Sequence, residues 1–340
     1  MLTARAPVRI DFAGGTTDIS PFCDVEGGVV LNAAISRYAY ASLKPREDNG
    51  ISITSSDFDE FIQVRDFREL EYNGSLDLIK AAIRKLNLTS GGMDIYVRCD
   101  APPGSGLGTS AAIGVALIAL LNEMYDLRLM RREIAELEYK VEVEELGIMG
   151  GKQDQYAAAL GGFNFLEFKG SHVEAHPLEL KGEVLWQLEK NLVLCYTGQS
   201  RLSGDTNRKM IEGYKRGVPE VVNSLRRIKE ITIEIRDKLL KGDLEGFGEL
   251  LMEEYRNRRN LAPEVVTPKI EELFEVALKN GATGGKICGA GGGGCVIFYC
   301  ENDLEGKVKR KLEETGGKVV EFNFSPSGVK VWWRKGGKSV

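Results

Sequence analysis

Two glycine-rich segments of different design lie far apart in the sequence, PPGSGLGTSAA at residues 102–112 and GGKICGAGGGGC at residues 284–295. The first follows a strand-like run, Met93–Val97, and precedes the apolar segment Ala111–Tyr125, so it joins a strand to the start of a helix. Glycines let backbone N–H groups approach a ligand closely, and a helix N-terminus carries a partial positive charge. This order of elements predicts an anion site suited to the phosphates of a nucleotide.

Three interpretations compete for residues 102–112. A Walker loop ends in lysine followed by serine or threonine, and Leu107–Ser110 contains no lysine. A dinucleotide fingerprint needs glycine where this chain has Thr109, and an acidic residue after the next strand, whereas the chain roughly twenty residues further on is still helical. A turn that only tightens a strand-to-helix connection remains an alternative for a single loop. The second glycine-rich loop favours phosphate binding.

Composition limits the class of protein. A chain of 340 residues with 43% hydrophobic residues can bury a sizeable core, and its length predicts two domains. The formal net charge of -5 argues against a nucleic-acid partner, because binding a phosphate backbone requires a basic surface. The longest apolar stretch, Ala111–Leu121, is too short to cross a bilayer, and the N-terminus has no long apolar core. We expect a soluble, cytoplasmic protein with neither membrane nor nucleic acid as partner.

Cysteine and histidine usage excludes several chemistries. The 6 cysteines include no CxxC pair and are expected to be reduced, without disulfides. His172 and His176 lie in a polar, glycine-flanked segment that reads as strand or loop, so surface positions are favoured over a metal site. With 2 histidines in the chain, a serine or cysteine triad is disfavoured, because such nucleophiles usually need an imidazole base.

Strands and helices alternate along the chain without internal repeats. We predict a domain boundary near residues 170–185, which gives an N-terminal domain of residues 1–175 and a C-terminal domain of residues 176–340. The charged helices of residues 221–260 are expected to present solvated outer faces. The predicted strands span residues 4–12, 28–35, 38–44, 50–55, 60–64, 93–97, 162–168, 192–196, 295–300, 319–323 and 329–334, and the predicted helices span residues 76–86, 111–125, 131–147, 154–160, 221–240, 244–260 and 268–280.

Asp154 is the best candidate for a catalytic carboxylate. It lies in the first turn of an alanine-rich helix within GGKQDQYAAALGG, residues 150–162, where the helix dipole favours its ionised form. A helix-capping role is the alternative. Lys152 and Glu142 add charges nearby, although helix pairing or capping would explain them as well. Phosphoryl transfer needs a phosphate cradle, a divalent metal with oxygen ligands and a group that positions the hydroxyl, so two phosphate loops make this chemistry the leading hypothesis.

Three motifs in order resemble the GHMP kinase superfamily, which includes galactokinases, homoserine kinases, mevalonate kinases and phosphomevalonate kinases. They are RAPVRIDFAGGTTD at residues 5–18, PPGSGLGTSAA at residues 102–112 and KICGAGGGGC at residues 286–295, so the resemblance covers essentially the whole chain. It implies a two-domain α+β fold, with a left-handed βαβ phosphate-binding unit in the N-terminal domain and a ferredoxin-like C-terminal domain. It also implies that ATP and Mg²⁺ are used.

The resemblance carries over to site residues one position at a time. Asp154 matches the catalytic aspartate, and Arg9 falls where galactokinases have an arginine beside it. Asp154 would orient or deprotonate the acceptor hydroxyl, while Arg9 would stabilise the transferred phosphoryl group. Ser110 and Glu142 match the residues that contact magnesium. The residues implied in binding ATP are Pro103, Gly104, Ser105, Gly106, Leu107, Gly108, Thr109 and Ser110.

A finer pattern is similar to the D-glycero-D-manno-heptose 7-phosphate kinases and related sugar 1-kinases. It consists of FAGGTTD followed by SPF, KQDQYAAALGG and YTGQSRLS. Galactokinases have GEHTDY where this chain has GGTTD at residues 14–18, which argues against galactose. The resemblance implies a small-molecule sugar or sugar phosphate as substrate, phosphorylated at the anomeric hydroxyl. Its expected ligands are Asp18, Thr17, Gly289, Gly291, Gly292 and Arg201, with Arg208 or Lys209 as further candidates for a substrate phosphate.

Alternatives remain open at this point. Asp18 would otherwise be a turn-forming aspartate, and the third motif a flexible hinge. The protein would otherwise be another sugar 1-kinase of the fucose, arabinose or galactose type, or a catalytically silent nucleotide- or sugar-binding regulator. Mevalonate or homoserine as substrate is disfavoured by the sugar-like first motif. A homodimer formed through a face or an edge of the C-terminal domain is a further alternative.

Overall fold

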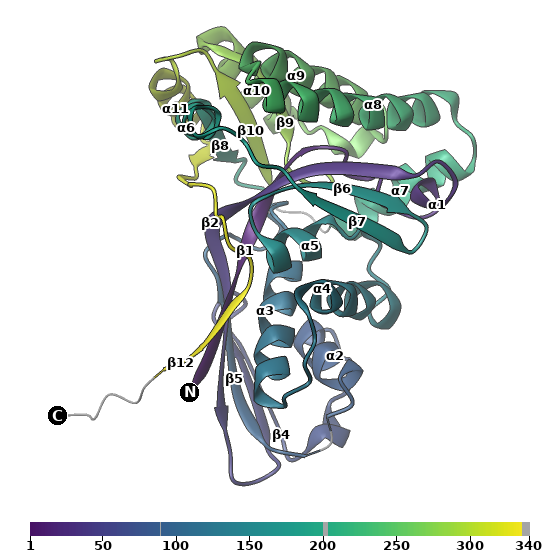
Figure 1. Cartoon of the computed structure of the whole chain (residues 1–340), viewed down its shortest axis with the longest axis vertical. Coiled ribbons are helices and arrows are strands. Elements are labelled where there is room, and N and C mark those ends of the chain that lie inside the picture. The colour runs from purple at the N-terminus through teal and green to yellow at the C-terminus, as the bar shows by residue number, and fades with distance from the viewer. Residues whose placement is uncertain (89, 200–202, 335–340) are drawn as a thin grey trace, which may run out of the picture.

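A computed structural model describes residues 1–88, 90–199 and 203–334. Its two sheets lie one above the other in Figure 1, with the first at the bottom and the second at the top. The first sheet contains β1 (Leu2–Ala13), β2 (Gly28–Pro45), β3 (Ile51–Ser55), β4 (Glu60–Val64), β5 (Met93–Cys99) and β12 (Lys330–Trp333) in the order β12-β1-β2-β5-β3-β4, and β6 (Phe163–Lys169) and β7 (His172–Pro177) branch from β2.

Strand β2 joins the two parts of this sheet. Residues 28–33 pair with β6, and residues 39–45 pair with β5. We predicted two separate strands here, but the structure has one strand of 18 residues. It continues because Ser36 and Ile35 are paired as well, with Asn323 and Phe324 of the returning C-terminal segment. Strands β3 and β5 are parallel, and their connection passes through β4 and α2 (Asp77–Lys85). The left hand expected for the βαβ unit stays a prediction.

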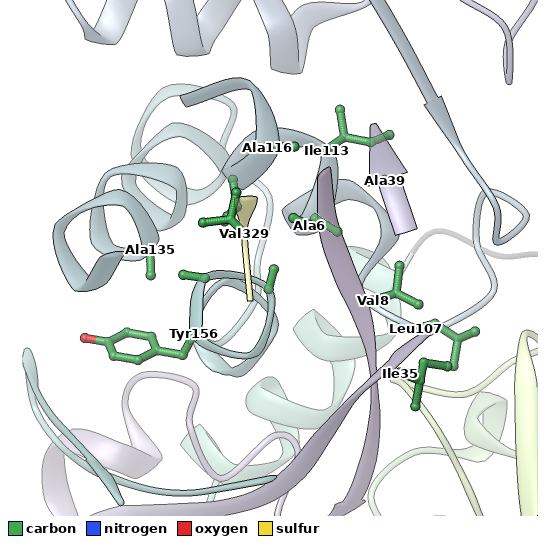
Figure 2. Packing of buried hydrophobic residues seen from close by; sticks show 14 of the residues in the cluster. Ala6, Val8, Ile35, Ala39, Leu107, Ile113, Ala116, Ala135, Tyr156 and Val329 are labelled. Carbon is green, nitrogen blue, oxygen red and sulfur yellow. The ribbon is translucent and has the colours of Figure 1, made fainter. Parts of the chain in front are cut away.

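Helices α2, α3 (Thr109–Met124), α4 (Arg131–Lys140) and α5 (Gln153–Leu160) gather on one side of the first sheet (Figure 1). Every residue of α3 from Ala111 to Leu121 is buried, which explains its unbroken apolar sequence. Leu107, in the preceding glycine loop, belongs to the same buried cluster as Val8 and Ile35 (Figure 2). Its side chain therefore anchors the loop to the sheet.

The second sheet has the order β11-β8-β10-β9, and all of its neighbouring strands are antiparallel. This order and direction are those of a ferredoxin-like domain, which confirms the expected fold of the C-terminal part. Its strands are β8 (Leu192–Tyr196), β9 (Ala282–Ile287), β10 (Cys295–Cys300) and β11 (Lys318–Val319), and its helices are α6 (Gly182–Asn191), α7 (Ser203–Lys215), α8 (Pro219–Lys241), α9 (Leu244–Arg259), α10 (Pro268–Asn280) and α11 (Glu305–Glu314).

Several elements differ from the sequence predictions. The helix expected over residues 131–147 changes at Val141–Glu145 into a π-helical turn and ends before Gly147, which has a φ of 65°. The strand expected at residues 319–323 is shorter and starts one residue earlier: β11 covers Lys318–Val319, and Val320 N–H also donates to Leu194 O of β8. Among the described residues, the helices α6, α7 and α11, the strand β9 and several short helical turns, such as Phe22–Val25, were not predicted. After β11 the chain returns to the first sheet, where β12 pairs with β1. The division at residue 175 stays a prediction.

Other expectations concern single residues. His172 and His176 are exposed on β7, where they hydrogen-bond to Glu174 and Glu167, so both lie on the surface as expected. The short helix α1 (Phe22–Val25) follows the first motif. All 6 cysteines are free. Among the described residues, no helix has the length and apolar character needed to cross a membrane.

Candidate functional site

The three motifs meet around the side chain of Arg9. Arg9 lies on β1, and its backbone N–H donates to Leu107 O at 2.9 Å, which ties the strand to the first glycine loop. Its guanidinium Nη1 donates to Gly106 O at 2.6 Å and to Cys288 O at 3.0 Å. One buried side chain therefore connects residues that are far apart in the sequence.

The two glycine loops also contact each other directly. A Cβ placed on Gly289 would lie 2.8 Å from Gly106 Cα, closer than side chains tolerate, so only glycine fits at this contact. Cys295 N–H, at the end of the third motif, donates to Ser105 O at 2.7 Å. The third motif thus packs directly against the first glycine loop. This contact accounts for its glycines, so the alternative of a flexible hinge is not needed to explain them.

The first loop ends at the N-terminus of α3. Gly108 precedes the helix with a φ of 74°, and Thr109 and Ser110 form its first residues. The first helical turn contains no acidic residue, so the positive end of the helix dipole is not neutralised from within the helix. Ser105 and Thr109 hydroxyls are 3.1 Å apart and stabilise the loop. Helix N-termini of this kind favour negatively charged ligands, and phosphate binding here stays a prediction.

Asp154 faces Arg9 across the loop. It lies in the first turn of α5, and its Oδ1 accepts from Arg9 Nε at 2.8 Å and lies 2.7 Å from Arg9 Nη2. Burial by itself lowers the pKa of Arg9, but the carboxylates of Asp154 and Asp11 outweigh it and raise that pKa, so the guanidinium is charged. Both contacts use Oδ1, and within the described part of the chain no hydrogen bond to Oδ2 is found. Oδ2 lies beside Gly108 and is available to a ligand.

A second group of oxygens lies at the start of α3. Ser110 Oγ donates to Glu142 Oε1, and Gln155 Nε2 donates to Glu142 Oε2 at 2.7 Å. Glu142 comes from the π-helical turn, which follows α4. Burial and, to a lesser degree, the charge of Asp154 raise the pKa of Glu142 to about 7, against the opposite effect of its two hydrogen bonds. The hydroxyl and carboxylate oxygens are ligands that Mg²⁺ prefers.

Two residues near Glu142 were not assigned to the site from the sequence. Gln155, next to Asp154 in KQDQY, orients the Glu142 carboxylate. Glu138 lies one helical turn before Glu142 and is fully buried, and among the described residues neither of its carboxylate oxygens has a hydrogen-bond partner of ordinary geometry. Burial raises the pKa of Glu138 well above its usual range, and the negative charge of Glu142 is the second cause of this rise. Gly114 leaves room for this carboxyl against α3, because a Cβ there would lie 2.6 Å from Glu138 Oε1. The i,i+4 spacing of the two glutamates was the available signal.

Asp18 and Thr17 close the opposite side of the site. Asp18 is 5% exposed, and its Oδ2 accepts from Gln153 N–H at 3.2 Å, one residue before Asp154. Thr17 is fully buried, and its hydroxyl donates to Gly14 O and Val29 O, so it stabilises the turn that carries Asp18. A role of Thr17 in binding a ligand stays a prediction.

The remaining candidates lie in different surroundings. Gly291 and Gly292 pack against Val265, and Gly292 N–H donates to Val265 O at 2.8 Å. Arg201 lies outside the described residues. On α7, Arg208 is exposed, and Lys209 pairs with Glu264. The structure thus brings together Arg9, Asp154, Ser110, Glu142, Asp18 and the loop of residues 103–110, with Gly289 packed against that loop.

The pKa of Asp18 predicts a pH dependence of stability. Burial raises this pKa from 3.8 to about 7, so between these values the folded chain binds a proton that the unfolded chain does not. The free energy of unfolding therefore falls as pH rises through this window, by up to about 4 kcal/mol from this group. Urea unfolding between pH 4 and pH 8 should give a flatter profile for Asp18→Asn than for the unchanged protein. Equal slopes would contradict this cause.

Comparisons with known proteins give matches in both the N-terminal and the C-terminal part of this chain. The family model "GHMP kinases N terminal domain" matches residues 77–162, and "GHMP kinases C terminal" matches residues 235–318. The D-glycero-alpha-D-manno-heptose 7-phosphate kinase of Campylobacter jejuni is 34% identical over 339 residues, which cover 97% of this chain and 98% of that protein.

Solved structures are similar to this chain along nearly its whole length. A D-glycero-D-manno-heptose 1-phosphate kinase from Bacteroides thetaiotaomicron is similar with a TM-score of 0.83 and 32% identity, covering 99% of this chain and 100% of that chain. The Lactococcus lactis galactokinase complexed with galactose has a TM-score of 0.79 at 21% identity, covering 97% and 95% of the two chains. At that identity, the likeness to the second structure concerns the fold alone.

Proposed function

This chain belongs to the GHMP kinase family, and from that premise we propose that it transfers a phosphoryl group from ATP to the anomeric hydroxyl of a sugar phosphate. The substrate we propose is a heptose phosphate, of the D-glycero-D-manno-heptose 7-phosphate type. Two relatives more than 30% identical along nearly their whole length are named heptose phosphate kinases, which supports this choice over other sugars.

The observation that carries the proposal is the Arg9–Asp154 ion pair. Only Oδ1 of Asp154 is used by the guanidinium, at 2.7 and 2.8 Å, so Oδ2 can accept the hydrogen of an incoming hydroxyl. The pair lies against the first glycine loop, since Arg9 donates to Gly106 O and Asp154 contacts Gly108. An acceptor hydroxyl on Asp154 is thereby placed beside the loop that would hold the ATP phosphates.

The other residues take complementary roles. Backbone N–H groups of residues 103–110 and the N-terminus of α3 would bind phosphate oxygens. The charged Arg9 would stabilise negative charge on the transferred group, from a site with little water around it. Ser110 and Glu142 would hold magnesium, and Gln155 keeps Glu142 oriented toward Ser110. When bound, that ion supplies positive charge to the phosphates of ATP.

A substrate panel tests the function. ATP consumption with magnesium is measured with heptose 7-phosphate, other sugar phosphates, free hexoses including galactose, fucose, arabinose, mevalonate and homoserine, and NMR locates the new phosphate on each product. Turnover of a heptose phosphate to an anomeric phosphate is the expected result. Turnover of free fucose, arabinose or galactose alone would replace the substrate class, and activity on mevalonate or homoserine alone would overturn sugar phosphorylation.

Ser110→Ala should weaken the dependence on magnesium rather than abolish nucleotide binding. It removes one proposed oxygen ligand and the hydrogen bond to Glu142, so the magnesium concentration for half-maximal rate should rise about 10- to 100-fold. A metal titration at saturating substrates measures this. Ser110→Thr keeps the hydroxyl and serves as control. A rise of the same size in both variants would point to packing around α3 instead of metal binding.

A further inference from the structure

A cluster of four buried charges lies behind the first motif. Asp11 comes from β1, Lys286 from β9, and Glu254 and Arg258 from α9, and each side chain is at most 1% exposed. Lys286 Nζ is 3.2 Å from Asp11 Oδ2, and Arg258 Nη2 is 2.7 Å from Glu254 Oε1. We predicted solvated outer faces for the charged helices of residues 221–260, and α9 contradicts this at these two positions. Each charge is buried because an opposite charge lies next to it.

Arg258 reaches beyond this cluster to the backbone of the first motif. Its Nη2 donates to Gly15 O at 2.9 Å, and its Nη1 donates to Thr16 Oγ1 at 3.5 Å. Gly15 fits tightly between the partners of this contact, since a Cβ there would lie 2.3 Å from Asp11 Oδ2 and 3.3 Å from Arg258 Nη2. Helix α9, in the C-terminal part of the chain, therefore holds the turn that leads to Asp18 through these hydrogen bonds.

The backbone of this turn, residues 14–17, is strained at Thr16. Thr16 has a φ of 79°, a left-handed conformation that β-branched residues rarely adopt. Strained residues persist only where the surrounding structure holds them, and they concentrate at binding sites. Thr17 ties the end of the turn to β2 through Val29, and Asp18 ties the following residue to α5 through Gln153. The backbone carbonyl of Gly15 and the hydroxyl of Thr16, at the strained position itself, accept from Arg258, and Thr16 Oγ1 also lies 3.9 Å from Met210 Sδ. Arg258 therefore adds the charged hold on the strained part of the turn.

We propose that Arg258 is a positioning residue for substrate binding: from α9 it holds the strained turn of residues 14–17 so that Asp18 faces the acceptor sugar beside Asp154. This inference rests on the proposed function in assigning the sugar to Asp18. The path is continuous, because Asp18 Oδ2 accepts from Gln153 N–H at the start of α5, and Asp154 is the next residue. The Arg258 side chain is 1% exposed, so it would act through the turn rather than by contact with ATP or the sugar.

Arg258→Lys is the informative variant. Lysine keeps the positive charge beside Glu254, but a single ammonium cannot replace the fork that reaches Glu254, Gly15 and Thr16 together. We expect the KM for the sugar phosphate to rise about tenfold, as for the loss of a charged hydrogen bond. The KM for ATP should stay unchanged. Hydrogen exchange of residues 14–19 should become faster, with little change in β9 or β10.

Two further variants separate positioning from general destabilisation. Leu251→Ala creates a cavity on the same helix, where Leu251 is fully buried, and should lower Tm without changing the KM for the sugar phosphate. Thr16→Gly removes the strain, because glycine adopts positive φ freely, so adding it to Arg258→Lys should recover part of the lost substrate affinity. No recovery would mean that strain at Thr16 is not what Arg258 holds, and would overturn the proposal.

The remaining outcomes are equally decisive. If Arg258→Lys leaves both the sugar KM and the exchange of residues 14–19 unchanged, or alters them no more than Leu251→Ala does, Arg258 is merely structural. If the unchanged protein phosphorylates no sugar phosphate, the proposed function fails, while hydrogen exchange still decides whether Arg258 holds the turn. Faster exchange confined to residues 14–19 would support that hold, and exchange spread evenly through α9 and β9 would overturn it.

Discussion

Asp154→Asn should reduce kcat by about 100- to 10,000-fold while ATP binding changes little. The substitution keeps the shape of the side chain, so Arg9 retains a carbonyl oxygen to which it can donate. It removes the negative charge that would orient the sugar hydroxyl and accept its proton, and an amide cannot accept that proton. The measurement is steady-state turnover of the sugar phosphate, together with the Kd for a non-hydrolysable ATP analogue.

The control for this prediction is a substitution in the same short helix. Gln155→Asn shortens the side chain that orients Glu142 and leaves the Arg9–Asp154 pair in place. It should shift the magnesium requirement more than kcat at saturating magnesium. If Asp154→Asn kept kcat within about threefold of the unchanged protein, Asp154 would be a helix-capping residue, and another group would have to position the hydroxyl.

Replacement of Arg9 should damage both catalysis and stability. Arg9→Met leaves the Asp154 carboxylate without its partner and leaves Gly106 O and Cys288 O without a donor, in a region where Arg9 is 4% exposed. The Asp154 side chain is 28% exposed, so water can solvate part of its charge, and we expect the free energy of unfolding to fall by about 1–3 kcal/mol. Loss of the positive charge at the transferred phosphoryl group should lower kcat by about 100- to 1,000-fold.

Arg9→Lys separates these two effects. Lysine restores the charge but cannot donate to Asp154, Gly106 O and Cys288 O at once. We expect partial recovery of the unfolding free energy, measured in urea, and a smaller recovery of kcat. Equal kcat for Arg9→Met and the unchanged protein would show that Arg9 only joins the loops.

The chemistry of the site is largely local and was predicted from the sequence. Glycines at residues 104, 106 and 108 all have positive φ. A helix follows the loop, as the order of strand, loop and helix predicted, although α3 starts at Thr109, two residues before the predicted start. Asp154 was assigned from its place in the first turn of an alanine-rich helix, which is where it lies. Such features depend on neighbouring residues, so a short stretch of sequence suffices to identify them.

What the sequence did not reveal depends on contacts between distant segments. The burial of Arg258 and Glu254 arises where α9 packs behind β1 and β9, and along the helix alone they are two charges among many. The same holds for Glu138, whose room is provided by Gly114 on another helix.

The sequence by itself therefore determined the two glycine-rich loops as candidate phosphate sites, Arg9 and Asp154 as a candidate catalytic pair, and the family, because motifs record local backbone geometry and residue chemistry. Only the tertiary structure decided which oxygen of Asp154 remains open, that Gln155 orients Glu142, and that Arg258 grips the turn before Asp18. Those properties depend on distances of a few ångströms between segments far apart along the chain, and residue order alone does not fix such distances.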